Sequence, residues 1–348
     1  MTRPPLIRPA ALRPGDTVGI CTPSFPAHVE FRDKYLHGVA QLEALGFRVI
    51  EGSLTRRATG QGYRSGPPRE RAAELAELFE DDSVRCIITT IGGNNSSSLI
   101  PYLDFERIRH KPKIFCGYSD ITSLHLALLA HAGLSTFYGP AVMPSFGEWP
   151  EVLPETRDSF LAATSTSERG ERELVAPQRY SRHLRNAKNG DWKTVPRAWL
   201  DNPGPRTLYS GTVEAPCLVA NLNTLVSAAG TDYFPELSGR ILVIEEMDAP
   251  LSAEERNLRH LERLGVFGEI VGLVIGKPEF YSNRGAPFDY ADLLREIVPE
   301  RHGVPVVMEA DLGHTVPMLT LAQETRLRVS ASPEGAARLF VLEPMVNG

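Results

Sequence analysis

The sequence has little that would suit a nucleic-acid-binding or membrane-bound protein. Lysine and arginine (37) are outnumbered by aspartate and glutamate (43), and no long basic block occurs. DNA, RNA and anionic membranes are bound through concentrated positive charge, so neither kind of partner is expected. The 348 residues also lack an apolar run of membrane length, and their first residues lack the apolar core of a signal peptide.

Cysteine is scarce, and its spacing argues against a disulfide framework and a thiolate metal site. The four cysteines lie far apart, mostly within apolar runs, at Cys21, Cys86, Cys116 and Cys217. We expect buried free thiols in a reducing compartment, and therefore a cytoplasmic protein. The sequence also lacks a His-Glu-x-x-His motif and a carboxylate cluster of ligand spacing, so neither a metal ion nor another cofactor is expected.

The order of strand-like and helix-like patterns predicts an α/β protein with two domains. Residues 1–165 alternate between the two, with a strand-like run at 17–21 and a helix-like segment at 69–79, which predicts a layered α/β domain with a mostly parallel sheet. A polar stretch at 166–205 is interpreted as a linker and surface loop. Residues 206–348 contain more strand patterns and predict a β-rich mixed C-terminal domain.

The motif Gly117-Tyr-Ser-Asp120 joins a strand-like run to a helix-like run. A serine at such a junction stands on a sharp turn with an exposed hydroxyl, which is the geometry of a nucleophile elbow. The amides at the start of the helix point into the same space. Serine and aspartate are also ordinary helix caps, and this motif alone favours capping. A nucleophilic Ser119 therefore needs a base and an orienting acid elsewhere in the chain.

One histidine is placed to act as that base. His314 lies in a loop with glycine and proline beside it, soon after the strand-like run 304–308. An exposed turn histidine is the alternative interpretation. The other histidines fit solvated or structural positions: His28, His37, His110, His125, His131, His183, His260 and His302.

The strand-like run 240–245 leads directly into acidic residues. A buried carboxylate needs a partner, and an imidazole N–H would supply one. Glu245, Glu246 and Asp248 are the candidates, and for the last two we favour simple exposure to solvent. Because side chains alternate along a strand, Glu245 and Glu246 point to opposite faces, and at most one of them can reach His314.

Two glycines follow another strand-like run, in Ile91-Gly-Gly-Asn-Asn-Ser96. Glycine lets backbone amides approach a ligand closely, and such amides can hold the oxyanion of a tetrahedral intermediate. The competing interpretation is a phosphate loop. The Gly-Lys-Ser/Thr ending and the Gly-x-Gly-x-x-Gly spacing are both missing, so binding of a nucleoside triphosphate or dinucleotide is not expected.

These motifs together resemble those of the serine peptidases that include the LD-carboxypeptidases of peptidoglycan recycling and the microcin C immunity peptidases. The resemblance covers nearly the whole chain and is carried by Gly92–Asp104, Gly117–Asp120, Ile244–Glu246 and Gly313–Pro317. It implies that Ser119 is the nucleophile, His314 the general base and Glu245 the group that orients it. The backbone amides of Gly93 and Asp120 would form the oxyanion hole.

The resemblance also implies substrate contacts at Gly92, Asn94 and Trp192. The Gly-Gly-Asn-Asn-Ser segment and an insertion with Trp192 and Trp199 look more like the microcin immunity branch, in which an aromatic side chain is expected to stack on a nucleotide base. The alternative is that both tryptophans anchor the loop to its own domain. The chain departs from the family at Val219-Ala-Asn-Leu222, where added side chains would narrow the cleft.

The leading hypothesis is a serine peptidase that hydrolyses an amide near the carboxyl end of a small peptidyl-nucleotide. An alternative is an LD-carboxypeptidase that releases a terminal D-amino acid from muropeptides. A non-catalytic ligand-binding protein of the same fold is a third hypothesis, from a different class. The resemblance further implies a homodimer, with the active site in the cleft between the two domains.

Overall fold

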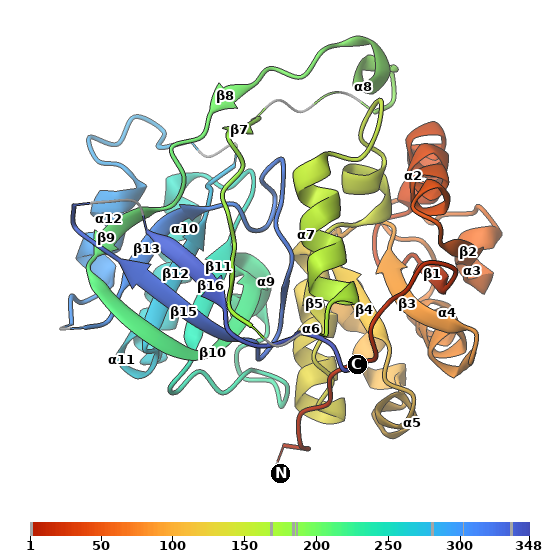
Figure 1. Cartoon of the computed structure of the whole chain (residues 1–348), viewed down its shortest axis with the longest axis horizontal. Coiled ribbons are helices and arrows are strands. Elements are labelled where there is room, and N and C mark those ends of the chain that lie inside the picture. Colours follow the sequence, from red (N-terminus) through yellow and green to blue (C-terminus); the bar gives the residue numbers. More distant parts are fainter. Residues whose placement is uncertain are drawn as a thin grey trace.

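The computed structural model describes residues 3–167, 170–182, 185, 187–279, 282–301, 303–334 and 337–348. The chain forms two large sheets that lie in two halves side by side, each with helices packed around it (Figure 1). The fold class expected from the sequence is confirmed, because the first sheet is mostly parallel and the second is mixed. Domain boundaries at 165 and 205 remain a prediction.

The first sheet has the strand order β14-β5-β4-β3-β1-β2, and within it only the β14–β5 pair is antiparallel. Its strands are β1 (Thr17–Cys21), β2 (Arg48–Glu51), β3 (Val84–Thr89), β4 (Ile114–Gly117), β5 (Phe137–Tyr138) and β14 (Leu321–Ala322). The last of these comes from the C-terminal part of the chain, which therefore returns to the first sheet. The carboxyl ends of β3 and β4 carry the Gly92-Gly93 turn and Ser119.

Helices and helical turns surround this sheet. They are α1 (Ala27–Glu30), α2 (Arg32–Ala44), α3 (Ser53–Arg56), α4 (Pro68–Glu80), η1 (Ser96–Tyr102), α5 (Phe105–His110), η2 (Ser119–Ile121), α6 (Thr122–Ala127), η3 (Leu128–Ala132), η4 (Val142–Phe146) and α7 (Pro154–Ser165). Helix α4 shows why the sequence forms them: Pro68 suits the first helical position, and Leu75, Leu78 and Phe79 bury one face.

The second sheet has the order β6-β16-β15-β10-β11-β12-β13-β9, with parallel pairing from β10 to β13 and antiparallel pairing on both sides. Its strands are β6 (Arg172–Glu173), β9 (Arg206–Tyr209), β10 (Gly211–Asn221), β11 (Ile241–Glu245), β12 (Gly272–Gly276), β13 (Val306–Ala310), β15 (Arg326–Ala331) and β16 (Arg338–Val341). The helices here are α9 (Leu222–Ser227), α10 (Leu251–Arg263), α11 (Val266–Glu269) and α12 (Tyr290–Ile297).

Strand β11 separates two hydrophobic cores. Ile241 and Val243 pack in the core that also contains residues of the first half, whereas Leu242 and Ile244 pack in the core under the C-terminal helices. Side chains alternate along a strand, so Glu245 continues the face that is turned toward the first half. This alternation supports the preference for Glu245 over Glu246.

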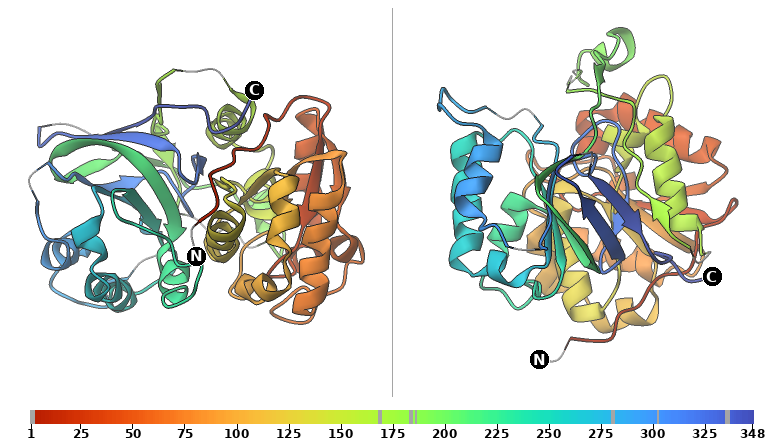
Figure 2. Two further views of the ribbon diagram at one scale, coloured as in Figure 1. Left: turned by 90° about the horizontal axis from the view of Figure 1, so that it is seen from below. Right: turned by 60° about the vertical axis from the view of Figure 1, so that its left-hand side comes forward.

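The segment between α7 and β9 is bound to both halves. It contains β7 (Arg179–Tyr180), β8 (Leu200–Asp201) and α8 (Asp191–Thr194), and Figure 1 shows it running across the top of the molecule. Figure 2 shows the first described residues running along the junction of the two halves, where Ile7 pairs with Leu134. All four cysteines are buried free thiols, as expected. None of the described helices combines the length and the apolar character that crossing a membrane requires.

Candidate active site

Ser119 occupies a strained turn at the end of β4. Its φ angle is 66°, in the left-handed region that residues other than glycine rarely adopt. The strand ends at Gly117 and helical structure begins at Ser119 itself. The backbone N–H of Ser119 donates a hydrogen bond to the Tyr138 hydroxyl over 2.9 Å. A strained serine between a strand and a helix is the geometry of a nucleophile elbow, which agrees with the expectation from the motif.

The Glu245 carboxylate is buried and hydrogen-bonded on both oxygens. Oε2 lies 2.6 Å from Nδ1 of His314 and accepts the His314 backbone N–H over 3.1 Å. Oε1 accepts the Tyr138 hydroxyl over 2.5 Å. Burial alone would raise the pKa of Glu245, but the charge and hydrogen bonds of His314 hold this pKa below its usual value. Glu245 is therefore the acidic residue that reaches His314.

His314 is oriented by the same contact. Burial alone would lower the pKa of His314, but the Glu245 carboxylate raises this pKa above its usual value. The Tyr118 ring packs edge-on against the imidazole, with 4.9 Å between the ring centroids. Because Nδ1 faces Glu245, Nε2 is the nitrogen left to take a proton. No hydrogen bond joins the Ser119 hydroxyl to this ring, although both residues line one cavity; such bonds often form only when substrate binds.

Two glycines in the expected motifs are required by close packing. A Cβ atom on Gly92 would lie 2.8 Å from Cβ of Ser119. A Cβ atom on Gly313 would lie 2.3 Å from Oε2 of Glu245, and Gly313 also has a φ of 90°. Any side chain at these positions would displace Ser119 or Glu245.

The loop after β3 is held next to Ser119 by two buried charged side chains. The Asp120 carboxylate accepts the Asn95 N–H over 2.9 Å and the Ser96 N–H over 2.8 Å. From helix α4, Arg71 donates to Oδ1 of Asn95 over 2.5 Å. The sequence suggested a role only for the Asp120 amide, whereas its carboxylate ties the Gly92-Gly93 loop to the elbow.

The cavity that contains these residues has a volume of about 680 Å³ and is formed by both halves and by the segment between them. Gly92, Gly93, Ser119 and His314 line it, as expected. Asn94 does not: it is exposed and lies outside the cavity lining, so the structure gives no support for its expected substrate contact.

Trp192 requires a correction. The sequence suggested an exposed indole in a polar loop, available to stack on a nucleotide base. The side chain is instead 1% exposed and does not line the cavity. Its ring packs against those of His37 and Trp149, at centroid distances of 5.6 Å and 6.1 Å, and Lys193 lies over it. The alternative, a tryptophan that anchors its loop, describes this structure. Trp199 is half-buried and also lies outside the cavity lining.

Two other expectations are also corrected. Val219 and Ala220 are buried in the hydrophobic cores on the two sides of β10, so they do not narrow the cavity. Glu246 is half-buried and not simply solvated, because it accepts the Asn221 side-chain amide and the Asn223 N–H, both over 2.9 Å. Asp248 is exposed, as expected.

The other described histidines do not enter the site. His125 is fully buried between Thr136 and the Gly117 carbonyl, and burial lowers its pKa to about 4. His183 and His302 lie outside the described residues.

Three contributors to the site were not identified from the sequence. Tyr138 bridges Ser119 and Glu245, Asn221 contacts Glu246 and Glu245, and Arg71 fixes the glycine loop. Their contacts join residues far apart in the chain, and no local motif marks them. Asn221 lies in the segment Val219–Leu222, of which only the added side chains of Val219 and Ala220 entered the expectation from the sequence.

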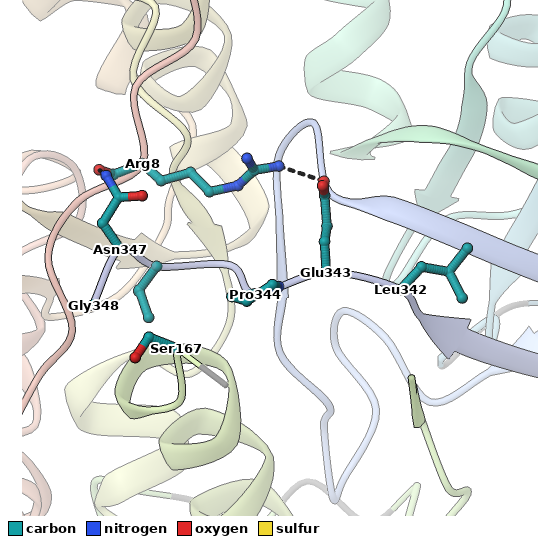
Figure 3. A pocket seen from close by; sticks show the side chains of 8 residues that line it. Arg8, Ser167, Leu342, Glu343, Pro344, Asn347 and Gly348 are labelled. Atoms are coloured by element: carbon teal, nitrogen blue, oxygen red, sulfur yellow. Dashed lines mark hydrogen bonds and ion pairs between the residues drawn. The ribbon is translucent and has the colours of Figure 1, made fainter. Parts of the chain in front are cut away.

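A second cavity of about 460 Å³ lies beside the last residues of the chain, and Figure 3 shows Arg8 reaching across it to Glu343. It contains none of the candidate residues and no nucleophile paired with a base. Among the described residues, no group of three histidine, cysteine or acidic side chains is placed to hold a metal ion. The chemistry gathered at Ser119 is therefore the candidate site.

Two family models match the chain, one described as the LD-carboxypeptidase N-terminal domain over residues 18–139 and the other as the LD-carboxypeptidase C-terminal domain over residues 214–329. The chain belongs to the LD-carboxypeptidase family. Within this family it is 36% identical to the microcin C7 self-immunity protein MccF of Escherichia coli, with 92% of each chain covered. It is 31% identical to a Bacillus subtilis (strain 168) protein named "Probable murein peptide carboxypeptidase", over 77% of this chain and 74% of that one.

Solved structures of MccF have the same fold as this LD-carboxypeptidase family member. The complex of MccF with aspartyl sulfamoyl adenosine superposes with a TM-score of 0.91 at 33% identity, covering 98% of this chain and 100% of that one. Other structures of MccF contain adenosine monophosphate or glutamyl sulfamoyl guanosine. The resemblance inferred from the motifs is confirmed at the level of the family.

Proposed function

We propose that this protein is a serine hydrolase of the LD-carboxypeptidase family that cleaves an amide in a small peptide conjugate. One observation carries the proposal: the strained Ser119 and His314 line the same cavity, and Nδ1 of His314 lies 2.6 Å from the buried Glu245 carboxylate. A nucleophile, a base and a buried acid that orients the base are the parts that a serine hydrolase needs. No cofactor enters this mechanism.

In the proposed reaction, Nε2 of His314 accepts the Ser119 proton as Oγ attacks the amide carbon. The ionised Glu245 stabilises the resulting imidazolium, and the backbone amides of Gly93 and Asp120 hold the oxyanion. His314 then returns the proton to the leaving amine. Water, activated by the same imidazole, hydrolyses the acyl-enzyme and regenerates Ser119.

For the substrate, we propose a peptidyl-nucleotide of the microcin C type. The similarity to MccF spans nearly the whole chain, and MccF structures contain aminoacyl sulfamoyl nucleosides. A muropeptide with a terminal D-amino acid is the second candidate, supported by the similarity to the Bacillus subtilis protein and by the family models. The expected homodimer and cytoplasmic location stay predictions.

The test is hydrolysis of both substrate classes by the purified protein and by Ser119→Ala, with the exposed serine variant Ser97→Ala as a control. Loss of the nucleophile should lower kcat at least about 1,000-fold, whereas the control should keep its activity. An unchanged rate in Ser119→Ala would reject the nucleophile. A parent protein that binds both ligands but hydrolyses neither would support the non-catalytic alternative.

A further inference from the structure

Four charged side chains in the catalytic cavity have no role in the proposed chemistry. Lys34, Glu148, Arg185 and Arg197 all line it. They come from α2, from the turn after η4 and from the segment between β7 and β8. Arg185 and Arg197 both form ion pairs with Glu148, and the Arg197 contact is 2.6 Å long. We name these residues the basic cluster.

The basic cluster contains three cationic side chains and a single carboxylate. Its single carboxylate, Glu148, is already shared by two guanidinium groups. Lys34 is 8% exposed, and its ammonium group takes part in none of the hydrogen bonds and ion pairs among the described residues. The buried Nε of Arg185 also has no acceptor. Buried charges in proteins are normally paired, so a surplus of cations around a cavity indicates an anion that the ligand supplies.

Lys34 keeps its charge under ordinary conditions. Burial lowers the pKa of Lys34 to about 8, and the neighbouring Glu148 opposes this effect while the two arginines add to it. A pKa near 8 leaves the ammonium mainly protonated at neutral pH. The cation is therefore present when ligand arrives, and binding an anion would stabilise it further.

The cluster is held in shape without ligand. Trp192 packs on His37, one turn along α2 from Lys34, and on Trp149, which follows Glu148. The segment that carries Arg185 and Arg197 is thus anchored by the buried indole between them. This gives Trp192 a supporting role in place of the expected stacking contact.

A second acidic residue of the cavity has charged neighbours that lie outside the basic cluster. Glu279 also lines the cavity and is fully buried, and its carboxylate oxygens have no hydrogen-bond partner among the described residues. The charges that act on Glu279 include Arg182, Lys277 and His314, and none belongs to the basic cluster. Glu279 therefore interacts with the charge of His314, whereas Glu148 is the carboxylate that acts on Lys34.

We infer that Lys34, Arg185 and Arg197 form an anion-binding subsite of the catalytic cavity, which takes a phosphate or carboxylate group of the substrate. This inference rests on the proposed function, because it assigns a substrate class to the same cavity. Phosphate would come from the nucleotide part of a peptidyl-nucleotide, and carboxylate from the free end of a peptide. Both are planar or tetrahedral oxyanions suited to arginine and lysine donors.

The subsite is tested by calorimetric binding in a Ser119→Ala background, which prevents turnover. One arm compares AMP with adenosine, and the other compares a peptide ending in D-alanine with the same peptide as its C-terminal amide. Lys34→Met should weaken binding of the anionic member of at least one pair by about 10- to 100-fold and leave its neutral partner unchanged. Lys34→Arg should restore most of the affinity. Lys111→Met, which removes a surface lysine outside the cavity lining, is the matched control.

The arm that responds identifies the source of the anion. Equal binding of both anionic ligands by Lys34→Met and its parent would overturn the inference, as would a parent that prefers neither anion over its neutral partner. Thermal unfolding of Lys34→Met checks that this variant is folded. Labelling of Ser119 in the otherwise unchanged protein by a fluorophosphonate tests the proposed function separately: failed labelling rejects the nucleophile and leaves the binding result valid.

Discussion

The substitution Gly92→Ala tests the packing of the elbow against the glycine loop. The added Cβ would lie 2.8 Å from Cβ and 3.1 Å from Oγ of Ser119. Carbon atoms in contact normally stay about 3.5 Å apart or more, so either Ser119 or the glycine loop must move by roughly 0.7 Å. Gly92 does not have a positive φ, so alanine can adopt its backbone conformation and the effect is steric.

A displacement of this size acts on the reaction more than on the fold. Misplacing a reacting group by about 1 Å costs roughly 100-fold in rate, so Gly92→Ala should lower kcat/KM by about 10- to 100-fold. Overpacking should reduce the free energy of unfolding by about 1–3 kcal/mol. The control is Gly268→Ala on α11, where a Cβ meets nothing within 4 Å.

The assay measures kcat/KM for the preferred substrate, the rate of fluorophosphonate labelling of Ser119 and the urea midpoint. Slower hydrolysis and slower labelling in a folded Gly92→Ala, beside an unaffected Gly268→Ala, would support the packing described here. If Gly92→Ala labels and turns over as fast as its parent, the loop does not constrain the nucleophile and the argument is wrong.

Three further predictions concern the acid and the base. Glu245→Gln should lower kcat by about 10³- to 10⁴-fold, because the charge that stabilises the imidazolium is lost, while steady-state kinetics of Glu246→Gln should show a change below about threefold. Glu245 raises the pKa of His314, so kcat/KM should rise with pH as His314 loses its proton, with a midpoint above pH 6.5. In Glu245→Gln this midpoint should move to lower pH, and an unchanged midpoint would contradict the coupling. Tyr138→Phe removes one hydrogen-bond partner from Ser119 and one from Glu245. It should lower kcat about 10-fold, and urea titrations should show a loss of about 1–3 kcal/mol in the free energy of unfolding. Parental values for both quantities would show that the Tyr138 bridge is unimportant.

The main residues of the candidate site could be found from the sequence because each follows a recognisable strand. Ser119 follows β4, Glu245 ends β11, and His314 comes four residues after β13. In sheets with parallel strands, the carboxyl ends gather the residues that bind ligands. The resemblance to the family pointed to Glu245, and strand alternation, which depends only on a period of two, added that Glu245 and Glu246 cannot both reach His314.

The rest of the site depends on contacts that local patterns do not contain. Tyr138 lies in a two-residue strand, and its hydroxyl meets a glutamate 107 positions away. The polar neighbours of Trp192 in the sequence leave open whether its indole is exposed or anchors the loop. The rings that cover it, His37 and Trp149, belong to α2 and to the turn after η4. Composition describes the neighbours along the chain, whereas burial is decided by neighbours in space.

Because the candidate site lies at the junction of the two halves, the contacts that hold the halves together also orient its residues. The first half supplies Ser119 and the glycine loop, and the second supplies Glu245 and His314. The bonds that cross the junction at this point include Tyr138 to Glu245 and the Asn221 N–H to the Thr122 hydroxyl. The same phenol therefore joins the halves and links Ser119 to Glu245. Any substitution that loosens this junction should therefore change the alignment of Ser119 with His314 and Glu245, even where both sheets stay intact.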